Sequence, residues 1–223
     1  MIGVSADLLR AAYLLLANSL EERKEPVLRL HDNHASSYAV AVIPLIVTAL
    51  DAWSNEIMGL WRATSSMSED TAAKLVEEPL IAKLRELGQE ISGAPLKVSA
   101  DLKLLVKVRD EIVHFLPYIQ DISSRKMQPA WFGELKRKCL VITSGDPALE
   151  YHFSQMLGSY ALAYWACETA RDSVRSLASA IPKTSIVAQS AERAVANFAS
   201  YESLAAPEDL KDFDARFGLK VTR

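Results

Sequence analysis

The densest group of chemically competent side chains in the chain runs from Arg109 to His114, as Arg-Asp-Glu-Ile-Val-His between apolar residues on both sides. An arginine carries a permanent charge, and its planar guanidinium matches a phosphate with two parallel hydrogen bonds. A histidine titrates near neutral pH, so it can take up and return a proton. Held at one phosphodiester, Arg109 and His114 could cleave RNA without a metal. The imidazole would activate the ribose 2′-hydroxyl or protonate the leaving oxygen, while the guanidinium stabilises charge on the phosphorus oxygens.

The spacing of the two residues limits how they can meet. On an ideal helix, five residues turn through 500°, which leaves the pair about 140° apart. Loosening of the last helical turn before Pro117 would bring them closer, or each would serve a site shared with a second subunit. We expect Asp110 to orient one of them, and Glu111 to lie at the solvated surface.

Other sequence motifs of catalysis are missing from the chain. It has no glycine-rich phosphate loop, H-E-x-x-H, G-x-S-x-G or C-x-x-C. His31 and His34 have a spacing that metal ligands can use, but no further cluster pairs with them, and His152 is interpreted as structural. The sequence therefore predicts neither a metal site nor a cofactor.

Charge is unevenly distributed along the chain. The segment 97–138 holds nine Lys and Arg against five acids, a balance of +4 in a chain whose net charge is -3, so the remainder carries -7. A basic segment on an acidic chain can guide an RNA backbone, although scattered surface charge is the alternative. The candidate RNA-binding residues are Lys107, Arg125, Lys126, Lys136, Arg137 and Lys138.

Hydrophobic periodicity predicts the elements that position these residues. Apolar positions recur at helical spacing and strand-like alternation is nearly absent, and 8 Gly and 9 Pro in 223 residues leave few turns. We predict an all-α bundle of about five main helices over residues 1–182, with a helical C-terminal extension at 183–223. Pro44 predicts a kink or a late start in the second helix. The five helices are expected from about residue 5 to 26, 36 to 63, 69 to 88 or shortly after, 99 to 116 and 147 to 180, with irregular or short helical structure between 117 and 145.

Two features bear on location. Only Cys139 and Cys167 are cysteines, which indicates reduced thiols. The longest apolar run, 38–50, contains 13 residues, whereas a membrane span needs about 20. We predict a cytoplasmic protein without a membrane segment.

The motif and its helical context resemble the HEPN superfamily, whose helical bundle carries Arg-x(4–6)-His, often with a polar residue after the arginine. Arg109, Asp110 and His114 match it at the four-residue spacing, and the resemblance covers roughly residues 5–180. It implies a homodimer in which two motifs face one cleft. It also implies a metal-independent endoribonuclease that acts on RNA as a toxin–antitoxin or antiphage effector, with an antitoxin or another protein as partner.

Two alternatives remain open. HEPN-like proteins also include non-catalytic binding or dimerisation modules. Arg109 could also pair with nearby acids on a solvated face, and His114 could be a helix-end histidine favoured by the helix dipole.

Overall fold

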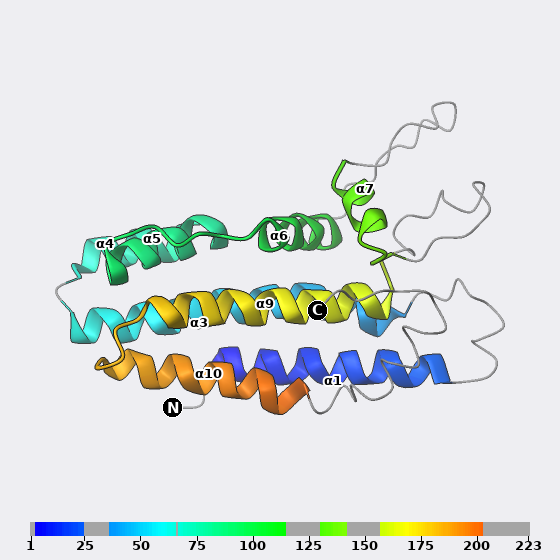
Figure 1. Ribbon diagram of the computed structural model, residues 1–223, viewed down its shortest axis with the longest axis horizontal. Coiled ribbons are helices and arrows are strands. Elements are labelled where there is room, and N and C mark those ends of the chain that lie inside the picture. Colours follow the sequence, from blue (N-terminus) through cyan, green and yellow to red (C-terminus); the bar gives the residue numbers. More distant parts are fainter. Residues whose placement is uncertain (1–2, 25–35, 66, 115–129, 142–156, 203–223) are drawn as a thin grey trace.

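The computed structural model describes residues 3–24, 36–65, 67–114, 130–141 and 157–202, and these residues form helices and no strand. The all-α prediction is confirmed, but the expected count of about five main helices is not, because the described residues form eight helices. Figure 1 shows three tiers: α4, α5 and α6 above, α3 and α9 in the middle, and α1 and α10 below. The helices are α1 (Val4–Lys24), α3 (Ser37–Thr64), α4 (Glu69–Glu77), α5 (Leu80–Ser92), α6 (Ala100–Val113), α7 (Ala130–Arg137), α9 (Tyr160–Ala180) and α10 (Ile186–Glu202).

Helix α3 is the centre of the bundle. It packs against α1, α4, α5, α6, α9 and α10. On its buried side, Ile43, Leu50 and Ile57 are at most 2% exposed. The predicted late start at Pro44 is wrong, because the helix begins at Ser37, where the Ser36 hydroxyl accepts a hydrogen bond from the Ala39 N–H. Proline is tolerated there because the surrounding contacts outweigh the one backbone hydrogen bond that it removes.

The N-terminus of α1 is fastened to α3 by a carboxylate. Glu56 accepts hydrogen bonds from the Ser5 backbone N–H (3.1 Å) and from the Ser5 hydroxyl (2.7 Å). A negative charge there satisfies free N–H groups and complements the helix dipole. Gly3 permits this approach, because a Cβ at that position would lie 2.4 Å from the Glu56 carboxylate oxygens.

The predicted third helix is two helices. Pro79 restricts the preceding Glu78 to an extended backbone (φ -67°, ψ 145°), so α4 ends there and α5 begins at Leu80. Helix α5 continues through Gly88 to Ser92. Gly88 provides close packing, because a Cβ there would lie 2.7 Å from the Leu96 backbone nitrogen of the returning chain.

Helix α7 shows that the region predicted as irregular or short helical contains a short helix. It ends in a Schellman motif, in which the Cys139 and Leu140 N–H groups donate to the Lys136 and Leu135 carbonyls. Cys139 therefore adopts a left-handed backbone (φ 55°) at a position that usually holds glycine. Ser159 next to α9 donates a hydrogen bond to the Leu140 carbonyl, which fastens the end of α7 to the bundle.

The predicted continuous helix over 147–180 is wrong at residues 157–159. Ser159 has an extended backbone (φ -83°, ψ 141°) and caps a new start through the Leu162 N–H, and the Gly158 carbonyl accepts from the Ser36 N–H. Residues 142–156 lie outside the described part. From the predicted extension, α10 packs on α1, α3 and α9, whereas the helix expected from about 206 lies outside the described residues. The domain boundary at 182 stays a prediction.

One described helix, α3, is long and apolar enough to cross a membrane by length and composition alone. Half of its most apolar window is buried inside the bundle. The core helix of a folded domain passes the same test, so this finding is weak evidence about location.

Candidate functional site

Helix α6 positions the predicted site. The Ser99 hydroxyl accepts from the Leu102 N–H at 3.1 Å and fixes the first turn. Leu102, Leu105 and Val108 are buried and anchor one side of the helix against the bundle. Because this side is fixed, the directions of Arg109, Asp110 and His114 around the helix axis are fixed as well.

Arg109 is a shielded cation with spare hydrogen-bonding capacity. Its side chain is 29% exposed, and its Nε lies 3.1 Å from Asp110 Oδ1. The Nε–H is buried and forms no hydrogen bond, so the contact with Asp110 is an ion pair without a well-directed N–H. No other described residue pairs with the guanidinium, which leaves its terminal nitrogens available for an anion.

Asp110 holds the side chain of Arg109 along the helix surface. Neighbouring helical residues project about 100° apart and do not face each other, so the contact requires the long arginine side chain to lie along the helix surface toward Asp110. His114 is four residues after Asp110 and therefore projects to nearly the same side. The ion pair thus draws the guanidinium toward the side on which His114 lies.

His114 is exposed and forms the C-cap of α6. Its backbone N–H donates to the Asp110 carbonyl at 2.8 Å, the regular α-helical pattern. The last turn is therefore not loosened up to His114, and the residues around Pro117 lie outside the described part. Among the described residues, no side chain pairs with the imidazole.

The predicted RNA-binding residues fall into three groups. Lys107 and Arg137 are exposed, and neither pairs with a described residue. Lys138 forms an ion pair with Asp101 (2.9 Å), and the Lys136 ammonium lies over the Phe132 ring, 5.4 Å from its centre. Arg125 and Lys126 lie outside the described residues. The structure thus engages two of the predicted cations in contacts within the protein.

Metal ligands do not gather in the part of the chain that the structure describes, where no group of three or more His, Cys, Asp or Glu side chains could hold an ion. His31, His34 and His152 lie outside it.

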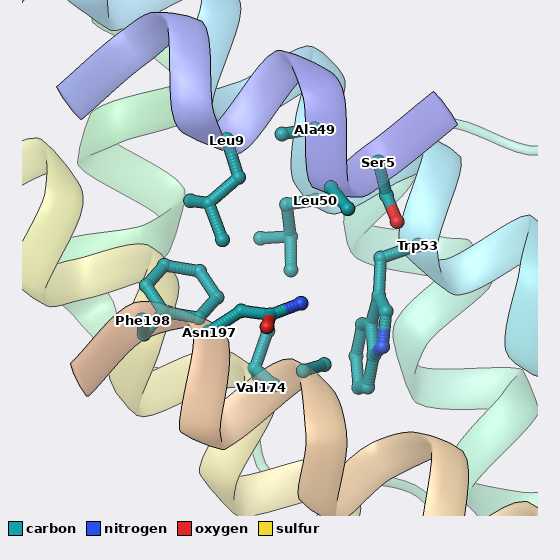
Figure 2. A pocket seen from close by; sticks show the side chains of 10 residues that line it. Ser5, Leu9, Ala49, Leu50, Trp53, Val174, Asn197 and Phe198 are labelled. Atoms are coloured by element: carbon teal, nitrogen blue, oxygen red, sulfur yellow. The ribbon is translucent and has the colours of Figure 1, made fainter. Parts of the chain in front are cut away.

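A narrow pocket opens between α1, α3, α9 and α10 (Figure 2). It has room for about one water molecule, near 20 Å³. The Asn197 side chain lies between Phe198 and Trp53, and the indole Nε1 of Trp53 is buried without a hydrogen-bond partner. No residue of α6 lines this pocket, so it is separate from the Arg109 site.

Sequence reasoning missed a buried ionic cluster between α5 and α3. The Lys83 side chain is 2% exposed, and its Nζ donates to Asp51 Oδ1 at 2.8 Å and to Asn55 Oδ1 at 2.9 Å. The signal was present: Lys83 falls at helical spacing with Leu80 and Leu87, so it lies on the buried side of α5.

Cys167 is a second buried polar group that the sequence analysis did not identify. Burial on α9 raises the pKa of its thiol well above the ordinary value, and the negative charge of Glu168 raises that pKa further, against a lowering contribution from Arg171. The thiol is therefore inert at neutral pH, whereas Cys139 is exposed.

No family model, no curated protein and no solved structure matches this chain.

Proposed function

We propose that this protein is a HEPN-like, metal-independent endoribonuclease whose site is built on the C-terminal half of α6. Arg109 binds and stabilises the scissile phosphate, His114 performs the proton transfers and Asp110 positions the guanidinium. The observation that carries the proposal is the α6 end itself. It presents an accessible imidazole and a guanidinium engaged only by Asp110 among the described residues.

The proposed reaction uses the substrate's own 2′-hydroxyl. His114 removes its proton and the 2′-oxygen attacks phosphorus. The protonated imidazole then returns the proton to the 5′-oxygen as the bond between that oxygen and phosphorus breaks. The products are a 2′,3′-cyclic phosphate and a 5′-hydroxyl, and no oxidant, metal or cofactor is consumed. Arg109 stabilises the charge on the non-bridging oxygens, where it is greatest in the transition state.

We also propose a homodimer, because the resemblance to the HEPN superfamily implies that two motifs face one cleft. On the regular α6, Arg109 and His114 leave the helix about 140° apart, so even with the guanidinium drawn toward Asp110 a second copy could supply the partner residue at each site. The same resemblance, and not the geometry, is the basis for proposing a cytoplasmic toxin–antitoxin or antiphage effector held in check by an antitoxin or another protein.

The test is cleavage of a labelled single-stranded RNA in the presence of EDTA, compared with the same RNA carrying one 2′-deoxy residue at the cut site. We expect cyclic-phosphate ends and no cutting at the deoxy position. His114→Ala should lower the rate by about 10²–10⁴-fold, the usual contribution of a general acid or base. Arg109→Ala should lower it comparably, whereas Arg85→Ala, which removes an exposed arginine on α5, should not. Intact RNA with the parent protein, or equal activity of all variants, contradicts the proposal.

Mixing the two inactive variants tests the dimer. If each site takes Arg109 from one copy and His114 from the other, half of the dimers in an equal mixture carry one intact site, and activity returns to about one quarter of the parent value. If both residues act within one copy, the mixture stays inactive.

The alternative is a non-catalytic binding or dimerisation module. The ion pair between Arg109 and Asp110 is compatible with it, because Asp110 would hold the guanidinium in place for a binding partner as well as for a substrate. A stable complex or dimer that persists in His114→Ala, with no RNA cleavage by the parent, would establish this alternative.

A further inference from the structure

The exposed side of α6 carries a line of four ionisable residues. Taking Lys103 as the origin and 100° per residue, Lys107 lies at about 40°, Asp110 at about -20° and His114 at about 20°. All four thus project within about 60° of one another. Lys103, Lys107 and His114 are exposed, which agrees with these angles around the helix axis.

The charge of this line is positive. Asp110 is its only acid, and its charge is compensated by Arg109. Lys103 and Lys107 form no ion pair or hydrogen bond with a described residue, in contrast to Lys83 and Lys138, which are both paired. Of the other acids on α6, Asp101 is bound by Lys138 on the opposite side, and Glu111 is half-buried with an interaction of its own.

The spacing along the axis fits a polyanion. At 1.5 Å per residue, Lys103 and Lys107 are about 6 Å apart, and His114 follows about 10 Å beyond Lys107. A straight line of two cations and an imidazole can follow one extended strand. The net charge of -3 on the whole chain disfavours tight binding of a duplex, whose phosphate charge is denser than that of a single strand.

We propose that the exposed side of α6, through Lys103 and Lys107, binds the backbone of single-stranded RNA and leads it to His114. This inference rests on the proposed function for its substrate. It adds Lys103, which the sequence interpretation did not include among the RNA-binding residues. It also predicts that the contact is electrostatic and independent of base identity.

The experiment measures binding without cleavage. The probe is a fluorescein-labelled 2′-O-methyl oligonucleotide of twelve residues, single-stranded or annealed to its complement, which has no free 2′-hydroxyl at any cut position. Its affinity for the full-length protein is measured by anisotropy across a series of KCl concentrations. The double variant Lys103→Gln/Lys107→Gln is compared with Lys74→Gln/Arg85→Gln, which removes two exposed cations from α4 and α5 and leaves the same net charge.

For single strands, each phosphate contact contributes about 0.7 to the slope of log K against log salt. We therefore expect the α6 double variant to lower the slope by about 1.4. If parent and variant bind with equal affinity at about 1 M salt, this corresponds to about 25-fold weaker binding at about 0.1 M salt. The α4/α5 control should bind like the parent, and the duplex should bind more weakly than the single strand. Equal weakening by both double variants, an unchanged slope, or preference for the duplex overturns the inference.

The outcome is separable from that of the nuclease proposal. A protein that binds the strand through the α6 lysines but cuts no RNA refutes the nuclease and leaves this binding surface intact. A protein that cuts RNA while Lys103→Gln/Lys107→Gln changes neither slope nor affinity refutes the binding surface alone.

Discussion

The buried cluster of Lys83 and the α6 cluster of Arg109 place a cation beside a carboxylate in opposite ways. Lys83 is almost fully buried and bonds to both Asp51 and Asn55 on α3. Arg109 retains partial exposure, touches only Asp110 among the described residues, and lies next to an exposed His114. A cation that only fastens two helices has its donors engaged within the protein, because unpaired buried donors are costly. A cation that is to bind a ligand must keep donors free, and the α6 cluster has this property.

The largest expected effect is on stability at Lys83. Lys83→Met keeps the apolar stem and removes the ammonium. It should lower the free energy of unfolding by about 2–3 kcal/mol, below the usual cost of breaking a fully buried pair because Asp51 remains reachable by water. Arg109→Met, the matched change on α6, should cost at most about 1 kcal/mol, as expected for partly exposed pairs.

Thiol labelling measures the effect of both substitutions on stability. With Cys139 blocked first, Cys167 reacts only when the core opens, because it is buried and its pKa is raised. We expect Lys83→Met to increase the rate of Cys167 labelling roughly 30- to 150-fold, the equivalent of that free energy, and Arg109→Met to change it only slightly. Equal rates for the two variants would remove the distinction between the clusters.

The second prediction replaces the carboxylate of each cluster by an amide. Asp51→Asn removes the counter-charge of Lys83 but keeps an amide oxygen that can accept a hydrogen bond from its Nζ, so it should cost about 1–2 kcal/mol in urea unfolding. Asp110→Asn should change stability by less than about 0.5 kcal/mol but lower RNA cleavage, because the guanidinium is no longer drawn toward His114. An Asp110→Asn protein as active as the parent would show that Asp110 does not position Arg109.

The smallest predicted effect lies at the end of α7. Cys139→Gly removes the cost of a left-handed backbone from a residue with a side chain and should raise stability by about 0.5 kcal/mol, net of the added flexibility of the unfolded chain. Urea unfolding with Ala at the same position as a control measures this gain. Alanine should give no gain, since it keeps the Cβ that opposes this conformation, and a gain as large as that of glycine would attribute the effect to loss of the thiol.

Local sequence was sufficient to predict a helix where the pattern that specifies it lies within the helix itself. The spacing of apolar residues in α3 and α6 predicted those helices, because helical periodicity depends on residues within one or two turns. The same patterns did not predict the break at Pro79 or the cap at Ser159, because both residues stand inside otherwise continuous helical periodicity. The α6 residues were identified by type and spacing, and their roles stay predictions.

Tertiary structure decided which charges are engaged and which are available. The sequence determined that the chain is helical and that an arginine, an aspartate and a histidine lie at the C-terminal end of one apolar helix. Both features depend on composition and on the period of the apolar residues. It did not determine that Lys83 bonds to Asp51 on α3, that Lys138 is bound by Asp101, or that Arg109 lies against Asp110. The first two pairings join residues 32 and 37 positions apart, which are brought within hydrogen-bonding distance only when the helices pack.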